Sequence, residues 1–323
     1  MLLMERWWLI MKDNLRYRGR VAQVRIYLGK LLRMFIYQND WKMLFMAALI
    51  AGLVTLAVGY QIYTSQEGTM MGCFALVCVC VWNGFFNSIQ IICRERPIIK
   101  REHRSGMHIS AYIAAHMVYQ MLLCIAQTII LLVICRTAGV HFPKQGLFSG
   151  SFMLDMGITM FLITYAADMI ALLISAVVHT TTTAMTVMPF MLIFQLVFSG
   201  GVITLRGALG KIKGFTLIYW GQKALCSLAD YNSLPMASLW PMVKKFQTVE
   251  VNGERPLKYL IEYIEQNNLT DRLAAEAGKY NGSTEYVFSA ANLLSCWGVL
   301  LVFIIVFAIA AVIILKFVDR DKR

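Results

Sequence analysis

Long apolar runs separated by short polar connections dominate the pattern of this 323-residue chain. A helix needs about 20 apolar residues to cross the hydrocarbon core of a bilayer. Helix is also the only open-chain structure that pairs every backbone polar group within its own segment. The pattern therefore predicts an all-α integral membrane protein with six transmembrane helices, at Met43–Tyr63, Met70–Cys93, Ile109–Cys135, Ser151–Val178, Ala184–Leu205 and Val287–Phe317.

The basic residues collect on one side of this predicted bundle. Residues 1–42 hold nine lysines and arginines, the connection 94–108 holds five, and the chain after Ile314 holds four. The connections 64–69 and 136–150 hold two between them. Because cytoplasmic loops accumulate lysine and arginine, we expect both termini in the cytoplasm and the protein in the plasma membrane.

The composition changes this picture little. Hydrophobic residues make up 59% of the chain and charged residues 15%, whereas a soluble domain carries about a quarter charged residues. The formal net charge is +12, but eighteen basic and seven acidic residues fall in the segments expected in the cytoplasm. Topology and contact with anionic lipid account for that excess, so no nucleic acid is expected as a partner.

The predicted spans divide the chain into five parts. These are a cytoplasmic N-terminal segment (1–42), transmembrane helices one to five with the connection 94–108 (43–205), an extended extracytoplasmic loop region (206–286), the sixth transmembrane helix (287–317) and a cytoplasmic tail (318–323).

The N-terminal segment contains an amphipathic stretch. Val24, Leu28, Leu31 and Phe35 share one helical face, with basic residues opposite. A basic amphipathic helix just before a span is typical of a helix that lies in the membrane interface. It serves either as a surface anchor or as a lever that relays the movement of a cytoplasmic partner.

The loop region between spans five and six has two halves. Its first half is apolar enough to re-enter the membrane or rest on its surface, and Pro256–Lys279 alternates charges with a helical period, which predicts one solvated helix. Cys226 lies in this loop with no obvious partner there. The other seven cysteines lie in or beside apolar runs, which favours small hydrophobes over a disulfide framework.

The connection 94–108 is densely charged for a loop between two spans. Its pattern continues in helical register past Pro97, and Gly106 is a plausible stop signal, so a short helix is expected. Such an element suits either a docking surface for another protein or an ordinary positive-inside loop.

Two acids fall inside the fourth predicted span. Asp155 is near its outer end, where hydration is expected. Asp168 is deep enough that its carboxylate costs about 2.5–3.5 kcal/mol to insert. It is either a substrate contact or proton-sensitive site, or it forms a buried hydrogen bond to a serine or threonine of a neighbouring helix.

An amide stripe follows the second predicted span. Asn83, Asn87 and Gln90 recur at helical spacing with aromatic residues beside them. Polar side chains hold transmembrane helices together, but a mixed amide and aromatic lining also suits an amphipathic substrate. Both interpretations remain open.

Common catalytic motifs are absent from the sequence. No GxxxxGK[ST], GxSxG or HExxH run occurs, and no histidine pairs with a carboxylate at metal-ligand spacing. We therefore expect no enzyme, no catalytic residues, and no cofactor or metal bound by this chain.

Several motifs, in order, resemble the membrane half of the G subfamily of ABC transporters, and ABC-2 permeases generally. The amphipathic stretch is similar to that family's connecting helix. The other matching positions are Arg94-Glu95-Arg96-Pro97, Arg101-Glu102, Gly106 and Ser110-Ala111-Tyr112, then Tyr165, Met169 and Ala171-Leu172, and finally Phe198-Ser199-Gly200, Trp220 and Tyr231.

The resemblance implies an ABC permease of the type V exporter fold. Such a protein moves lipid-like, peptide or other amphipathic substrates by alternating access, in a dimer with a second copy or a paralogue. No ATPase precedes the first span here, so a separate ABC ATPase subunit is expected to bind ATP and Mg, an arrangement that suits a bacterium. Val24–Gln38 would be the connecting helix and Pro97–Gly106 the coupling helix.

The resemblance also implies two sets of site residues. The ATPase-docking set is Glu95, Arg96, Lys100, Arg101, Glu102, His103 and Arg104. The substrate-cavity set, between the second and fifth spans of two copies, is Trp82, Asn83, Phe86, Asn87, Phe190, Phe194 and Val197. The alternative function is an ATP-independent channel or ion-coupled carrier that uses Asp168.

Overall fold

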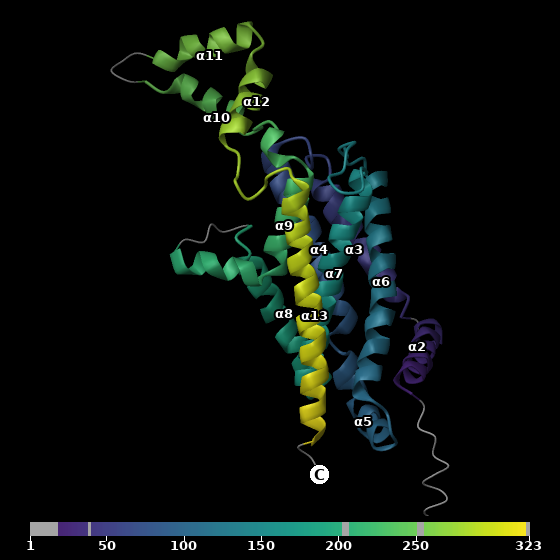
Figure 1. The fold of residues 1–323 in the computed structure, drawn as a ribbon. Helices are drawn as coiled ribbons and strands as arrows, with labels where there is room; N and C mark the ends of the chain where they lie inside the picture. The colour runs from purple at the N-terminus through teal and green to yellow at the C-terminus, as the bar shows by residue number, and fades with distance from the viewer. Residues whose placement is uncertain (1–18, 38–39, 202–206, 251–254, 321–323) are drawn as a thin grey trace, which may run out of the picture.

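The computed structural model describes residues 19–37, 40–201, 207–250 and 255–320, and over these ranges it contains helices and no strands (Figure 1). The all-α class is therefore confirmed. The elements are α2 (Arg20–Tyr37), α3 (Lys42–Val58), α4 (Gln66–Ser88), α5 (Ile91–Arg104), α6 (Ile109–Thr137), α7 (Phe152–Val177), α8 (Thr181–Phe198), η1 (Gly207–Phe215), α9 (Leu217–Leu228), η2 (Tyr231–Ser233), α10 (Leu239–Lys245), η3 (Phe246–Thr248), α11 (Pro256–Gln266), α12 (Thr270–Tyr280) and α13 (Ala290–Arg320).

Five helices among the described residues are long and apolar enough to cross a membrane. They are α4 with its continuation α5, α6, α7, α8 and α13. The first predicted span is shorter than expected, because α3 ends at Val58 and the chain turns before α4, with Tyr63 at a left-handed φ of 65°. A sixth span is reached only if α2 and α3, which are bent by 68° relative to each other, count as one. Six spans and an interfacial α2 thus stay predictions.

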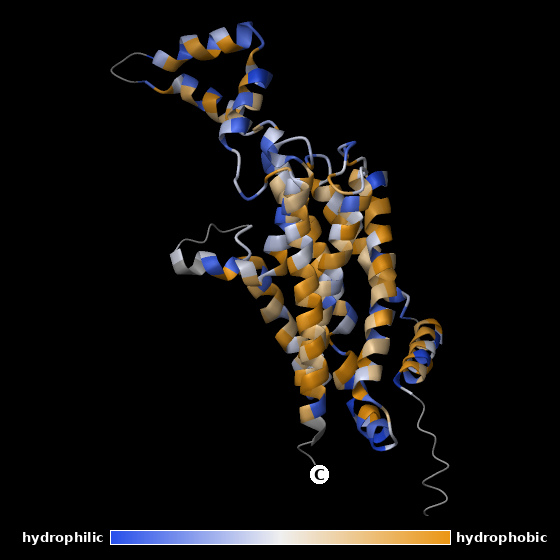
Figure 2. Ribbon diagram, viewed as in Figure 1, coloured by the Kyte–Doolittle hydropathy of each residue, from blue (hydrophilic) through white to orange (hydrophobic). Residues whose placement is uncertain are grey.

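The hydropathy of the ribbon separates the bundle from its two ends (Figure 2). Apolar residues cover α6, α8 and α13 along their lengths, whereas polar residues collect at α5 and at the opposite end, around α10 to α12. This distribution is the one expected for a bundle that crosses a bilayer, with polar elements in water on both sides.

Helix α7 is the centre of the bundle and packs against α4, α13, α6 and α9. Small residues allow these close approaches, as is common between helices in membranes. A Cβ on Gly84 of α4 would lie 2.3 Å from the carbonyl oxygen of Thr164, and one on Gly221 of α9 would lie 2.7 Å from Ile163. By contrast α8 is peripheral, and its Phe190 side chain is 70% exposed.

Helix α9 belongs to the core rather than to a surface loop. Most of its side chains are buried, and it packs against α4, α7 and α13. It also places Cys226 next to Cys73 of α4, and both are free thiols. No partner from the loop was expected for Cys226, and its neighbour comes from a span far away in the sequence.

The predicted helix Pro256–Lys279 is two helices. Asn268 adopts a left-handed φ of 52° and separates α11 from α12. Residues 235–250 and 255–281, which include α10, η3, α11 and α12, form a small projection that we call the distal subdomain (Figure 1). It lies at the end of the bundle opposite α5.

Gln66 at the start of α4 fastens the distal subdomain to the bundle. Its backbone N–H donates to the carbonyl of Pro235 at 3.0 Å. Its side-chain amide donates to the carbonyls of Gly278 at 2.7 Å and Tyr231 at 3.3 Å, and accepts from Asn281 at 3.2 Å. The side chain is fully buried, so α4 and the distal subdomain are joined by a satisfied polar contact.

Candidate functional site

Helix α5 begins on a hydroxyl of the central helix. The Ser175 Oγ atom of α7 accepts hydrogen bonds from the backbone N–H groups of Ile92 at 3.0 Å and Cys93 at 3.2 Å. These N–H groups lie in the first turn of α5 and have no partner within the helix. α5 ends at Arg104, and Gly106 follows with a φ of 99°, as the expected stop signal requires.

Two of the predicted docking residues point into the protein. Glu95 is 6% exposed and accepts a hydrogen bond from the Tyr112 hydroxyl at 2.9 Å. Arg96 is 7% exposed and donates a hydrogen bond to the backbone carbonyl of Ala176, in the last turn of α7. These side chains hold α5 against α6 and α7, and their role in docking stays a prediction.

A third predicted docking residue, Glu102, joins α5 to α2. Its carboxylate accepts a hydrogen bond from the Tyr27 hydroxyl at 2.7 Å. Burial raises the pKa of Tyr27 well above its usual range, and the neighbouring Glu102 adds to the shift, so the hydroxyl keeps its proton and remains a donor. Gln23 completes the contact: its amide donates to the carbonyl of Gly106 at 3.2 Å and accepts from the backbone N–H of His108 at 2.9 Å.

The remaining predicted docking residues lie at the surface. Arg101, His103 and Arg104 are exposed and Lys100 is partly exposed. Together they give α5 a cationic outer face, and the buried acids fix the helix beneath it. We call the contacts of α5 with α2, α6 and α7 the α5 junction. The sequence did not identify Tyr27, Gln23 or Tyr112 as parts of it, because each acts through a contact between helices that are distant in the sequence.

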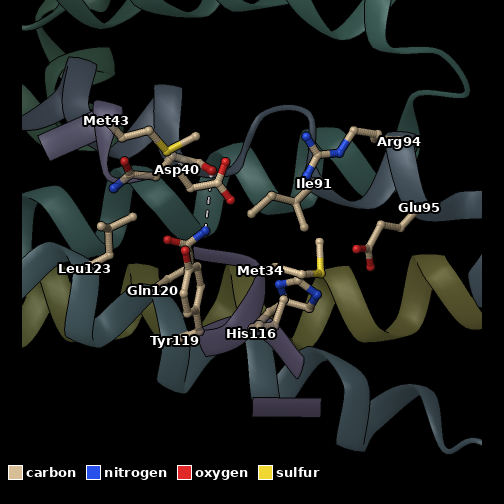
Figure 3. Close-up of a pocket in the computed structure, with 12 residues that line it drawn as sticks. Met34, Asp40, Met43, Ile91, Arg94, Glu95, His116, Tyr119, Gln120 and Leu123 are labelled. Atoms are coloured by element: carbon tan, nitrogen blue, oxygen red, sulfur yellow. Dashed lines mark hydrogen bonds between the residues drawn. The ribbon is translucent and has the colours of Figure 1, made fainter. Parts of the chain in front are cut away.

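A small pocket with a mostly apolar lining lies next to the α5 junction, among α2, α3, α4, α5 and α6 (Figure 3). Its volume is about 40 Å³, and Glu95, His116 and Gln120 contribute to its lining. A buried water needs about 10–15 Å³ and two or more polar partners, so the pocket has room for water. His116 is 1% exposed, and neither ring nitrogen has a hydrogen-bond partner.

The amide stripe of α4 faces α6 and α3. Asn87 and Gln127 exchange two hydrogen bonds of 2.9 Å through their side-chain amides. Asn83, Phe86 and Asn87 line a pocket of about 270 Å³, together with Gln127 and residues of α3. The contact between α4 and α6 agrees with the helix-holding interpretation, and the pocket leaves room for an apolar ligand.

The other predicted cavity residues lie outside that pocket. Phe190 on α8 is 70% exposed, Phe194 and Val197 are partly buried on the same helix, and Trp82 on α4 is 39% exposed. Within the described part of this chain the two groups do not line a common pocket. The cavity between two copies therefore stays a prediction.

The two acids of α7 have different surroundings. Asp168 is fully buried, and the Ser88 hydroxyl of α4 lies beside it. Neither carboxylate oxygen has a hydrogen bond of good geometry to any residue that the structure describes. Asp155 is also fully buried, so the expectation of a hydrated side chain is wrong. Its carboxylate accepts hydrogen bonds from the backbone N–H groups of Phe148 at 2.8 Å and Ser149 at 2.9 Å, which closes the loop before α7.

Among the residues that the structure describes, no group of three or more histidine, cysteine, aspartate or glutamate side chains could hold a metal ion.

Comparison with known proteins agrees with this arrangement. The ABC-2 type transporter family matches residues 30–227, which include α5, the residues of both pockets and nearly all of α9. The ABC transporter ATP-binding/permease protein Rv1747 of Mycobacterium tuberculosis is 29% identical over 168 residues, which are 50% of this chain and 19% of that protein. The chain thus matches about a fifth of that relative's length. It belongs to the ABC-2 type transporter family, as a membrane component of an ABC transporter.

Proposed function

We propose that this chain is the permease subunit of an ATP-driven exporter and that α5 docks a separate ABC ATPase, which binds ATP and Mg. The observation that supports this most is the cationic face of α5, with Arg101, His103 and Arg104 exposed, on a helix fixed from behind by Glu95 and Glu102. The name of the M. tuberculosis relative combines ATP binding and permease. In our proposal the ATP-binding part is supplied by a partner.

The fixed position of α5 allows movement to be transmitted. A displacement of α5 would be transmitted to α7 through Ser175, to α6 through Tyr112 and to α2 through Tyr27. Because the hydrogen bonds go to three helices, α5 moves only with the bundle and not by itself. That is the behaviour required of an element that converts ATPase closure into alternating access.

We propose an amphipathic substrate, lipid-like or peptide, and a pathway completed by a second permease copy or a paralogue. The pocket of about 270 Å³ combines amide groups with Phe86 and methionines of α3, a lining that suits an amphipathic molecule. The exposed aromatic side of α8 is available to a second copy. We further propose that both termini lie in the cytoplasm, because basic residues concentrate in the segments next to them and in α5.

Nucleotide dependence tests the proposal. Proteoliposomes would contain this chain with a candidate ABC ATPase, and a fluorescent phospholipid analogue would report movement between leaflets. We expect movement to require ATP and Mg and to stop when the lysine of the ATPase Walker A motif is replaced. Equal movement without nucleotide would overturn the proposal.

A second candidate rests on Asp168, whose buried carboxylate has no hydrogen bond of good geometry among the described residues. A channel or ion-coupled carrier would use this group to bind a proton or cation. It predicts flux driven by a gradient in the absence of nucleotide, and loss of that flux in Asp168→Asn. If Asp168→Asn leaves flux and its pH profile unchanged, this candidate is excluded.

A further inference from the structure

A groove lies at the end of α4 farthest from α5, between the bundle and the distal subdomain. Its volume is about 820 Å³, within the range of about 300–1,000 Å³ that is typical of small-molecule sites. The turn between α3 and α4 forms one wall, and α10 and α12 form the other. Its lining includes Tyr60, Gln61, Glu67, Trp240, Thr270 and Asp271.

Hydrogen bonds hold the two walls in register. The Glu67 carboxylate accepts from the backbone N–H groups of Ala237 at 3.0 Å and Ser238 at 3.1 Å, and from the Ser238 hydroxyl. Within the distal subdomain, the backbone N–H of Met236 donates to the carbonyl of Ala274 on α12 at 3.0 Å, which fixes the wall that Glu67 contacts. The groove is thus a defined feature of the fold and does not depend on loose packing between two parts.

The charges around the groove are unbalanced. Each other described acid of the distal subdomain has a basic partner; the pairs are Glu250–Arg255, Glu262–Lys258, Glu265–Lys244 and Glu276–Lys279. Asp271 forms no ion pair among the described residues, and it lines the groove. No lysine or arginine is among the lining residues, so Asp271 and Glu67 leave the groove with a net negative charge.

Two aromatic rings complete the lining. Tyr60 is 68% exposed, and its hydroxyl accepts a hydrogen bond from the Gln61 amide at 2.7 Å, which restricts the position of the ring. Trp240 of α10 lines the groove from the distal subdomain. The faces of tyrosine and tryptophan attract cations, and tryptophan does so most strongly. A carboxylate together with such rings favours a cationic ligand and disfavours an anion.

We propose that this groove binds a small organic cation, a quaternary ammonium or protonated amine, with its charged head held by Asp271 and by the rings of Tyr60 and Trp240. The groove is separated from the α5 junction by the length of α4. The proposal therefore stands on the groove itself and holds whether or not the chain works as an ATP-driven exporter.

The test is a binding measurement on the full chain in nanodiscs, with choline as the cation and its uncharged carbon isostere, dimethylbutanol, as the matched neutral compound. Saturation-transfer NMR gives the affinity of each. We expect choline to bind and the isostere to bind at least about tenfold more weakly, the size of one charge or cation–π contact. No choline binding, or equal binding of the isostere, would overturn the proposal.

Variants locate the site. Asp271→Asn and Trp240→Leu should each weaken choline binding about tenfold. Glu276→Gln is the matched control, because it removes an acid of the same helix that already pairs with Lys279, and choline affinity should then be unchanged. Circular dichroism and thermal unfolding check that each variant is folded. If Asp271→Asn unfolds the distal subdomain, Trp240→Leu still decides, and binding unchanged in a folded Trp240→Leu protein places the cation elsewhere.

Discussion

Gly84 of α4 offers the most direct test of the packing around α7. A Cβ at this position would lie 2.3 Å from the carbonyl oxygen of Thr164, 2.7 Å from the Cβ of Ala167 and 2.8 Å from the backbone nitrogen of Asp168. Two of these atoms belong to the backbone of α7 and cannot rotate away. To reach an ordinary contact of 3.4 Å, the two helices have to separate by roughly 1 Å in Gly84→Ala.

The expected cost follows from that separation. Overpacking a well-packed core costs about 1–3 kcal/mol, and replacing glycine by alanine inside a helix returns about 1 kcal/mol. Because the clash is with backbone, we place the packing cost at the upper end, which leaves Gly84→Ala destabilised by about 2 kcal/mol. For 323 residues, that loss corresponds to a Tm lower by about 3 °C.

The assay is thermal unfolding of the purified protein in detergent, followed by intrinsic fluorescence. Gly52→Ala is the matched control: Gly52 lies within α3, and a Cβ there would have no atom within 4 Å. Its Tm should be equal to or above that of the original protein. A Gly84→Ala protein as stable as the original would show that α4 and α7 are not in close contact, and an equal loss in Gly52→Ala would remove the steric explanation.

Three further changes test other contacts. Tyr27→Phe removes the hydroxyl that donates to Glu102 and should lower the free energy of unfolding by about 2 kcal/mol, since the acceptor is charged; chemical denaturation measures it. Asp155→Asn replaces a carboxylate that accepts two backbone hydrogen bonds and should cost about 2 kcal/mol in the same assay. A short membrane-permeant thiol cross-linker should join Cys73 to Cys226 within one folded chain, with the linked peptides identified by mass spectrometry, because the two thiols are neighbours.

Controls and contrary results differ among these three. Tyr37→Phe, at an exposed position of α2, should leave stability unchanged, and an equal loss there would argue against the Tyr27 contact. Stability unchanged in Asp155→Asn would mean that the carboxylate is hydrated after all. Cross-links from Cys226 to Cys296 instead of Cys73 would show that α9 packs with a different rotation.

The sequence predicted the long helices well because apolar length alone decides them. The runs at Ile109–Cys135 and Ser151–Val178 correspond closely to α6 and α7. The first span was predicted too long, because the apolar run continues through Tyr60 and Tyr63 after the helix has ended. In the turn Tyr60 is exposed and Tyr63 is buried. Hydropathy does not detect the change of backbone direction that separates them from the helix.

The junction was predicted in place but not in orientation. Charge density identified residues 94–108 as a short helix, yet Glu95 and Arg96 face inward. Which side of a charged helix is buried depends on partners such as Tyr112 and Ser175, and these lie elsewhere in the sequence. The groove beside the distal subdomain was missed for the same reason, since its two walls are about 170 residues apart along the chain, as the contact of Glu67 with Ala237 shows.

The central claim is that the cationic face of α5 docks an ABC ATPase, and co-purification tests it most directly. The chain would be tagged and expressed with the candidate ABC ATPase. Arg101→Glu combined with Arg104→Glu reverses two exposed charges of α5, and Arg136→Glu reverses one exposed charge at the opposite end of α6. We predict that the ATPase co-purifies with the original chain and with Arg136→Glu and is lost from the α5 variant. Recovery of the ATPase at an unchanged ratio with the α5 variant would contradict the account.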